Sequence, residues 1–409
     1  MKQAWPSMTL KDVCQIKPPK SEARQRVSAV GLVSFLPMED LGIDEKFVQP
    51  TRTKPLASVV GSYTYFANGD VLLAKITPCF ENGKLGIATG LTNEIGFGSS
   101  EYIVFRPNRT LTKEWLYYYL SRETFRIEGA TQMSGAVGHK RVSKEFIDSY
   151  PIPLPPLPEQ QRIVAILDES FKAIDTAKAN TKKNLQNARA LFESHLNAVF
   201  SQGGEEWIEN NLQALTTKIG SGATPRGGGK AYKTEGLSLI RSLNIYDTGF
   251  HYEKLAFIDE DQANKLSNVE VESQDVLLNI TGASITRCCV VPEAVLPARV
   301  NQHVSIIRPI RSKIDAEFLH YLLISKPYKD HLLQTGIEGG STRQAITKSQ
   351  IQNFKICYPE TISDQRTIVT KLNALATQTR HLESIYQKKL AALDELKKSL
   401  LHQAFKGNL

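Results

Sequence analysis

The feature that most constrains this chain is an internal repeat, because its second half repeats the motifs of its first half in the same order. The run DVLL at Asp70 recurs at Asp275, 205 residues later. Other matches keep offsets of 202 to 205 residues, and a tryptophan near the start of each half fits the same spacing. A solenoid repeat is far shorter, so the sequence predicts a duplicated module of roughly 200 residues. The further matches pair Arg106-Pro107 with Arg308-Pro309, Trp115 with Phe318, Ser143 with Thr347, Gln161 with Gln365, Phe200 with Phe405, and Trp5 with Trp207.

Each half begins with a globular part of mixed α and β character. Strand-like runs rich in Val and Ile occur as GDVLLAKI and SEYIVFRP in the first half, and as DVLLNIT and HVSIIRP in the second. Helical patterns, KEWLYYYLSRETF and AEFLHYLLISKPY, follow these strands. We therefore expect one α+β domain over residues 1–155 and another over residues 203–359, each large enough for its own core.

The stretch PLPPLPEQQRIVAIL, from Pro153 to Leu167, joins the first globular part to a long helical segment. Proline fixes φ and keeps the preceding residue extended, so the proline run predicts a stiff extended strut. Pro158 and Glu159 are typical of a helix start, where the missing N–H costs nothing and the carboxylate lies near the positive end of the dipole. No Gly or Pro follows before Phe200.

Apolar residues in the segments 156–202 and 360–409 step by alternating threes and fours, which is typical of a coiled-coil seam. A helix of about 43 residues is roughly 65 Å long. Because that is too long to fold back onto a small domain, we expect the two helices to pack antiparallel, with a pseudo-two-fold axis like that of a dimer. The alternative is a surface helix on each domain. The predicted seam residues are Leu167, Phe171, Ile174, Leu185, Phe192, Val199, Leu372, Leu375, Leu382, Leu393, Leu396 and Leu400.

Composition places the chain among ordinary globular proteins, with 41% hydrophobic and 22% charged residues. Its 409 residues predict two or more domains. Five cysteines form no CxxC pair, which argues against a zinc site or a disulfide framework and fits a reducing cytosol. No apolar run approaches the roughly 18 residues that span a bilayer, and the N-terminus lacks a signal-peptide core. We expect a cytoplasmic protein without a membrane partner.

The sequence carries no readable catalytic constellation. GATPRGGGKAY superficially resembles a phosphate loop, but Thr224 stands where the first glycine belongs and Ala231 where a Ser or Thr would bind magnesium. No GxGxxG, HExxH or GxSxG motif occurs, nor an Asn-Pro-Pro-Tyr or Asp-Pro-Pro-Tyr tetrapeptide of amino-methyltransferases. We therefore expect a binding protein with no catalytic residue and no metal site.

Two similar domains at a fixed separation suit duplex DNA, whose half-sites recur on one face about every 34–36 Å. A net charge of +8 permits such a partner. Lys and Arg bind phosphates, whereas Arg, Asn and Gln can read the edges of G and A. Taken singly, each such charge is more often a solvated surface residue. The candidate DNA-contact residues lie in loops: Lys17, Lys20, Arg24, Arg26, Lys75, His139, Lys140 and Arg141 in the first copy, and Arg226, Lys230, Lys233, Arg241, Asn244, Arg343 and Gln344 in the second.

The loops of the two copies differ in sequence, although the motifs around them are repeated. The run KITP at Lys75 aligns with NITG at Asn279. Such divergence is what two readers of different DNA sequences on one scaffold would show, and neutral drift after duplication would give it too.

The whole arrangement resembles the specificity subunit of type I restriction-modification enzymes. The resemblance rests on the PLPPLPEQQRIVAIL stretch, its partner DQRTIV, the GDVLL and QDVLL strands, the GSGATP loop and the closing LLHQAFKGNL. It covers essentially the full chain. The second copy departs from the pattern, because it lacks the PLPPLPEQ run and has Cys357-Tyr358 in place of a proline-leucine pair.

The resemblance implies that each globular part is a target recognition domain for one half of a split DNA sequence. The paired helices would fix the unread gap and dock two modification subunits, which bring S-adenosylmethionine and methylate a flipped-out adenine at N6. Restriction subunits using ATP and magnesium would join them, in a bacterial or archaeal cytoplasm, and this chain would hold no cofactor itself. Two alternatives are a coiled-coil adaptor that binds only protein, and a detached fragment of a fused methyltransferase–endonuclease, which would need a cofactor site.

Overall fold

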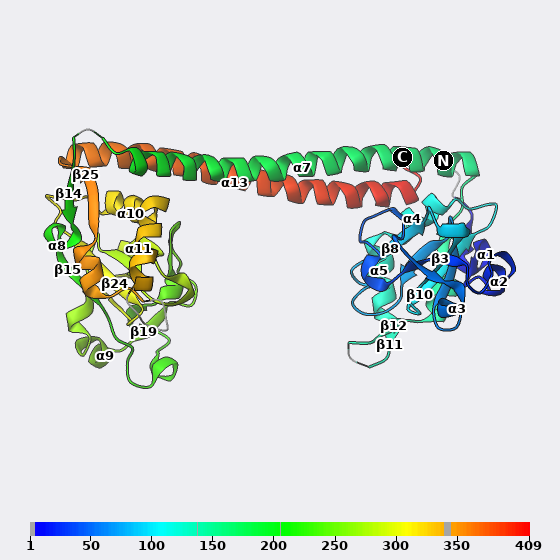
Figure 1. Cartoon of the computed structure of the whole chain (residues 1–409), viewed down its shortest axis with the longest axis horizontal. Coiled ribbons are helices and arrows are strands. Elements are labelled where there is room, and N and C mark those ends of the chain that lie inside the picture. The colour runs from blue at the N-terminus through cyan, green and yellow to red at the C-terminus, as the bar shows by residue number, and fades with distance from the viewer. Residues whose placement is uncertain (1–4, 137, 205, 339–344) are drawn as a thin grey trace. The chain divides into compact units, whose positions relative to one another are not determined.

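The computed structural model describes residues 5–136, 138–204, 206–338 and 345–409. The chain divides into two compact units, unit 1 with residues 1–182 and 388–409, and unit 2 with residues 183–387. Each unit holds one globular part together with a segment of each of two long helices, α7 (Leu157–Gln202) and α13 (Ile362–Phe405) (Figure 1). The mixed α and β parts and the two long helices are as the sequence predicts. None of the described helices combines the length and apolar content needed to cross a bilayer.

The globular part of unit 1 is built on two sheets, with strand orders β2-β10-β7-β8-β4 and β5-β3-β9-β6. The two predicted strands, β7 (Val71–Ala74) and β10 (Tyr102–Pro107), pair antiparallel at the centre of the first sheet. The predicted helix, α4 (Lys113–Leu120), buries its aromatic residues against that sheet. The other strands are β2 (Cys14–Ile16), β3 (Leu32–Leu36), β4 (Phe47–Val48), β5 (Arg52–Pro55), β6 (Thr64–Ala67), β8 (Leu85–Ala88) and β9 (Ile95–Gly98), and the other helices are α1 (Leu10–Val13), α2 (Ser21–Arg26), α3 (Leu56–Val59), α5 (Glu123–Thr131) and α6 (Lys144–Ser149).

Unit 2 repeats this plan with the strand orders β15-β24-β21-β22 and β19-β16-β23-β20. Its two predicted strands, β21 (Val276–Asn279) and β24 (Val304–Pro309), again pair antiparallel, and the predicted helix α10 (Ala316–Ile324) follows them. The remaining elements are β15 (Thr216–Ser221), β16 (Leu237–Ile240), β17 (Ile245–Tyr246), β18 (Gly249–Phe250), β19 (Ala256–Ile258), β20 (Glu270–Val271), β22 (Cys288–Val290), β23 (Ala298–Val300), α8 (Leu212–Leu215), α9 (Glu260–Asn264), α11 (Lys326–Glu338) and α12 (Lys348–Asn353).

The proline run begins in an extended strand, as predicted, whereas its last two residues, Leu157 and Pro158, already belong to the helix α7. β13 (Pro151–Pro153) pairs with β1 (Ser7–Thr9), and α7 begins at Leu157, one residue before the predicted start. In unit 2, β25 (Lys355–Pro359) pairs with β14 (Trp207–Asn211) and leads into α13. The second copy therefore keeps the extended entry to its helix although most of the prolines are missing.

A buried glutamine in the first turn of α7 ties this helix to the globular part of unit 1. The side-chain oxygen of Gln160 accepts the Thr112 N–H at 2.9 Å, and its amide nitrogen donates to the carbonyls of Thr110 and Pro155, both at 2.8 Å. Because Gln160 is fully buried, these bonds satisfy an amide that would otherwise be costly to bury.

Gln365 makes the same three contacts in unit 2, to the Asp315 N–H at 2.8 Å and to the carbonyls of Lys313 and Pro359 at 3.0 and 2.9 Å. Gln365 is therefore the counterpart of Gln160, not of Gln161 as the sequence alignment predicts. Gln161 is exposed. The true offset here is 205 residues, the same as that of the DVLL strands.

The C-terminal end of a long helix also contributes an aromatic ring to the core of each globular part. In unit 1 the ring of Phe405, on α13, lies 4.5 Å from that of Trp115, which packs edge-on against Trp5 at 5.7 Å. In unit 2 the same positions hold Phe200, on α7, and Phe318, at 5.5 Å. Unit 1 is therefore completed by the helix of the second copy, and unit 2 by the helix of the first.

The two long helices pack together and run antiparallel. Lys178 pairs with Asp394 at 2.5 Å within unit 1, and Arg189 pairs with Glu383 at 3.2 Å within unit 2. Lys178 and Arg189 are eleven residues apart on α7, and their partners Asp394 and Glu383 are eleven residues apart on α13 in the opposite order. The two helices therefore run antiparallel.

The predicted seam residues differ in burial. Leu382 and Leu396 lie 38% and 46% exposed, so the seam does not pass through them. At these turns the covered positions are Glu383 and Lys397 instead, because Glu383 pairs with Arg189, and Lys397 pairs with Asp44 and lies over the Phe171 ring at 5.3 Å. Leu167, Phe171, Ile174 and Leu372 are buried, and Leu185, Phe192, Val199, Leu375, Leu393 and Leu400 are partly buried.

Candidate nucleic-acid interface

In unit 1, three loop segments meet where β7 ends and β10 begins. The Lys75 N–H donates to the Glu101 carbonyl at 2.9 Å, and the Val142 N–H donates to the Lys75 carbonyl at 3.0 Å. A further bond joins the Thr77 N–H to the Lys140 carbonyl at 2.9 Å. The strands β11 (Met133–Ser134) and β12 (Arg141–Val142) flank this meeting point, at the end of the globular part away from α7 (Figure 1).

These backbone hydrogen bonds at Lys75 and Thr77 form what we call the loop frame. The frame brings four of the predicted DNA-contact residues together: Lys75, His139, Lys140 and Arg141. The Arg141 guanidinium donates two bonds to the Glu101 carboxylate, at 2.9 and 2.7 Å, and a third to the His139 carbonyl at 3.0 Å. This guanidinium holds the pKa of Glu101 below its usual value. Glu101 is not among the contact residues predicted from the sequence, because at the edge of the run EYIVFRP it resembles an ordinary strand boundary.

The residues Lys17, Lys20 and Arg24 form a second basic group in unit 1. Burial, and then the charges of Lys17 and Arg24, lower the pKa of Lys20. The Lys20 ammonium donates to the carbonyls of Val60 and Gly61 at 2.9 and 2.8 Å, so it holds the loop after α3. Lys17 and Arg24 are exposed, and Arg26 pairs with Glu94 at 2.8 Å on the surface.

Unit 2 repeats the frame of unit 1. The Ile280 N–H donates to the His303 carbonyl at 3.0 Å, and the Ile346 N–H donates to the Ile280 carbonyl at 2.9 Å. Ile280 is therefore the counterpart of Lys75, whereas the sequence alignment pairs Lys75 with Asn279. The position of Glu101 is occupied by His303.

Different side chains fill this second frame. The Nδ1 atom of His303 lies 2.6 Å from the Thr281 hydroxyl, and its Nε2 lies 3.2 Å from the amide nitrogen of Gln302. Thr224, in the Gly-rich loop that follows β15, donates to the carbonyl oxygen of the exposed Gln302 side chain. Gln302 and His303 are not among the contact residues predicted from the sequence, because they border the strand-like run HVSIIRP and do not lie in a Gly-rich basic loop.

The predicted contact residues of unit 2 are more dispersed. Arg226 and Lys230 are exposed, and Lys233 pairs with Asp259 at 3.1 Å. Arg241 lies over the Tyr232 ring at 5.1 Å. Arg343 and Gln344 lie outside the described residues.

Asn244 is buried rather than presented to a ligand. Its amide nitrogen donates to the carbonyls of His251 and Glu253 at 2.9 and 3.2 Å, and its oxygen accepts the Arg241 N–H at 3.1 Å. Because all these bonds are internal and the side chain is fully covered, we assign Asn244 to holding the loop after β18 and not to base reading.

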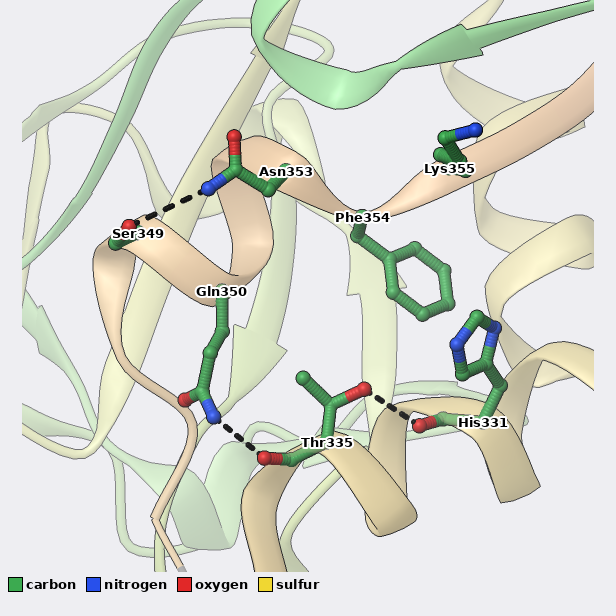
Figure 2. A pocket seen from close by; sticks show the side chains of 7 residues that line it. All are labelled: His331, Thr335, Ser349, Gln350, Asn353, Phe354 and Lys355. Atoms are coloured by element: carbon green, nitrogen blue, oxygen red, sulfur yellow. Dashed lines mark hydrogen bonds between the residues drawn. The ribbon is translucent and has the colours of Figure 1, made fainter. Parts of the chain in front are cut away.

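A hollow of about 280 Å³ lies elsewhere in unit 2, between α11, α12 and the start of β25 (Figure 2). Its polar side chains bond to one another or to nearby carbonyls: Thr335 donates to the His331 carbonyl at 2.8 Å, and Asn353 donates to Ser349 at 3.4 Å. It carries none of the predicted contact residues. Within the described ranges, no group of three or more His, Cys, Asp or Glu side chains could hold a metal ion.

Comparison with known proteins identifies the class to which this scaffold belongs. Residues 2–187 and 217–390 match the family model described as the type I restriction modification DNA specificity domain. The chain therefore belongs to this family, and the two matched segments agree with the two copies of the module.

Several named relatives are similar to parts of the chain. The specificity subunit of the type I restriction enzyme EcoAI from Escherichia coli is 35% identical over 210 residues, which cover 50% of this chain and 35% of that protein. The MjaVIII specificity subunit from Methanocaldococcus jannaschii is 25% identical over 325 residues, covering 74% of this chain and 72% of its own length. The match thus spans about a third of the EcoAI subunit.

Two solved structures share the fold. One, a chain from work on complex assembly and conformational transition of the type I R-M system, has a TM-score of 0.78 at 21% identity, covering 99% of this chain and 98% of that one. The HsdS subunit from Thermoanaerobacter tengcongensis has a TM-score of 0.67 at 20% identity, covering 100% of this chain and 98% of its own.

Proposed function

We propose that this chain is the non-catalytic specificity subunit of a type I restriction-modification enzyme, and that it binds a bipartite DNA target. Residues 1–155 and 203–359 are two target recognition domains, each reading one half-site. The segments 156–202 and 360–409 are the spacer helices, which set the gap between half-sites. Membership of the specificity-domain family supports this assignment.

The observation that carries the proposal is a repeated backbone frame with different side chains. The backbone hydrogen bonds of Lys75 to Glu101 and Val142 recur at Ile280, whereas the side chains change from Glu101 and Arg141 to Gln302 and His303. Base pairs differ in the hydrogen-bond donors and acceptors on their edges. The same backbone frame with two different sets of donor and acceptor side chains therefore suits the recognition of two different DNA sequences.

The partners follow from this role. Two modification subunits dock on the paired helices and hold S-adenosylmethionine, and restriction subunits supply the ATP- and magnesium-dependent steps. The chain acts in a bacterial or archaeal cytoplasm. Base flipping and methyl transfer take place in the partner, since a base must leave the duplex to reach a methyltransferase site.

Methylation-sensitive sequencing tests the proposal directly. A host expressing this chain with its methyltransferase partner should carry N6-methyladenine in one bipartite motif, and the motif should disappear when this chain alone is deleted. Methylation that is unchanged by the deletion would contradict the proposal. Exchange of residues 1–155 for those of another family member should alter one half-site only, and a simultaneous change of both would exclude independent readers.

The second candidate function is a coiled-coil adaptor that binds protein alone, which the packed helices favour. DNA affinity distinguishes the two functions. A DNA-reading subunit loses affinity steeply as salt rises, because phosphate contacts release counterions. An adaptor shows no such salt-dependent binding to duplex DNA.

A further inference from the structure

The loop frames of the two units present side chains at equivalent backbone positions. Glu101 and His303 each immediately precede the long central strand of their unit, and the carbonyl of each accepts a hydrogen bond from the first residue after the neighbouring strand, Lys75 or Ile280. Because the backbone is fixed in the same way, a difference in what these two frames recognise comes from their side chains.

In unit 1 the frame holds an oriented arginine. Arg141 uses one hydrogen on Nε and one on each terminal nitrogen to bind Glu101 and the His139 carbonyl. A guanidinium has five N–H donors, so one hydrogen remains on each terminal nitrogen. Two such donors match the O6 and N7 acceptors of guanine. The Arg141 side chain is 46% exposed.

The adjacent carboxylate complements the other base of the same pair. The side chain of Glu101 is 22% exposed and its oxygens keep lone pairs beyond those that Arg141 engages. Carboxylates accept from the N4 amino group of cytosine. Glu101 and Arg141 together therefore suit one G·C pair.

In unit 2 the frame holds an oriented amide. The Gln302 amide is exposed, and its two ends are held by Thr224 and by His303, which Thr281 positions in turn. A glutamine amide presents one donor and one acceptor side by side, the pattern that adenine N7 and N6 complement. This arrangement suits an A·T pair.

We infer that Glu101 with Arg141, and Gln302 with His303, are the specificity-determining side chains of the two half-sites, the first selecting a G·C pair and the second an A·T pair. This inference rests on the function proposed above. His303 acts as a positioning residue, and Arg141, Glu101 and Gln302 touch the bases.

The test uses the full complex of this chain with its modification subunits, and reads N6-methyladenine in genomic DNA by sequencing. Arg141→Gln should change the preference at one position of one half-site from G·C towards A·T by about fivefold or more, the lower end of what a bidentate contact discriminates. Gln302→Arg should do the reverse in the other half-site. The controls are Asp148→Asn and Glu209→Gln, which remove carboxylates from other ion pairs of the same units and should leave the motif unchanged.

The outcomes separate the inference from the function beneath it. If both variants methylate DNA with the wild-type motif, the inference is overturned and the proposed function stands. If the wild-type complex yields no bipartite motif, the proposed function fails and the inference with it. Should Arg141→Gln not fold, as measured by its unfolding temperature, Gln302→Arg in the other unit decides by itself.

Discussion

The side-chain oxygen of Gln160 accepts the backbone N–H of Thr112 at 2.9 Å inside unit 1, where the glutamine is fully buried. Removing this amide takes a hydrogen-bond partner from three backbone groups, at Thr110, Thr112 and Pro155. We expect Gln160→Ala to lower the free energy of unfolding of unit 1 by about 2–4 kcal/mol. The neighbouring Gln161 is exposed, and Gln161→Ala should cost less than about 0.5 kcal/mol.

Tryptophan fluorescence during denaturant unfolding can report this difference. Trp5 and Trp115 lie in unit 1, and Trp207 lies in unit 2. In a Trp207→Phe background the signal therefore follows unit 1 alone. Equal destabilisation by the two glutamine variants would show that Gln160 does not anchor the helix.

A second prediction concerns the seam of the long helices. Leu167 is fully buried, so Leu167→Ala should cost about 2–5 kcal/mol of unit 1 stability. Leu396 lies 46% exposed, and Leu396→Ala should cost less than about 1 kcal/mol, although the heptad pattern of the sequence places both in the seam. The same fluorescence measurement compares them. A large loss for Leu396→Ala would place it back in the seam.

A third prediction is a pH dependence of unit 2. Complete burial lowers the pKa of His320 below its usual value near 6.5. The unfolded chain then binds a proton that the folded chain does not, so the stability present above about pH 6.5 is lost as the pH falls towards the folded pKa, by at most about 1.4 kcal/mol per pH unit. Denaturant unfolding at about pH 7.5 and 5.5 should show this loss, and His320→Gln should reduce it. If His320→Gln lost as much stability between these two pH values as the wild type, titratable groups other than His320 would cause the loss.

The antiparallel register allows a matched test of the spacer. Deleting seven residues between Lys178 and Arg189, and seven between Glu383 and Asp394, preserves both ion pairs. Since seven helical residues rise about 10 Å, the gap of the methylated motif should shorten by roughly three base pairs. Deletion from α7 alone breaks the register and should abolish methylation. A paired deletion with an unchanged gap would exclude the helices as the spacer.

A fifth prediction concerns the thiols. Burial raises the pKa of both Cys14 and Cys289 to about 12, and raises that of the fully buried Cys288 as well. Because the thiolate is the reactive form, these three should resist alkylation in the folded chain. Cys79 and Cys357 are partly exposed and should react first, and all five should react in denaturant, as mass spectrometry can show. Rapid alkylation of Cys14 in the folded chain would contradict its burial.

The strands and the long helices could be predicted because their signals are local. Val71–Ala74 and Val276–Asn279 are short apolar runs between turn residues, and the helices lack internal Gly and Pro. The seam was predicted less well, because apolar side chains also occupy the position just outside it, as at Leu396. The position beside it belongs to Lys397, whose burial depends on Asp44 and Phe171 in another part of unit 1.

The candidate site, like the seam, depends on contacts between distant parts of the chain, which the sequence does not reveal. Exposed basic residues can be recognised in a sequence, but the hydrogen-bond partners of a side chain cannot. The Asn244 amide donates to the carbonyls of His251 and Glu253, and the Lys20 ammonium donates to those of Val60 and Gly61. These internal bonds cannot be read from the sequence. Glu101 gains its candidate role only because the fold places Arg141, forty residues later, against it.

The packing of Phe405 against Trp115 has a consequence for the order of folding during translation. The ring that completes the aromatic cluster of unit 1 is on α13, which the ribosome makes after the globular part of the second copy. Phe200 of unit 2, by contrast, is already present when that unit emerges. The part of the protein that is synthesised first is thus the last to acquire its complete core, and it must wait on the ribosome with Trp115 partly uncovered.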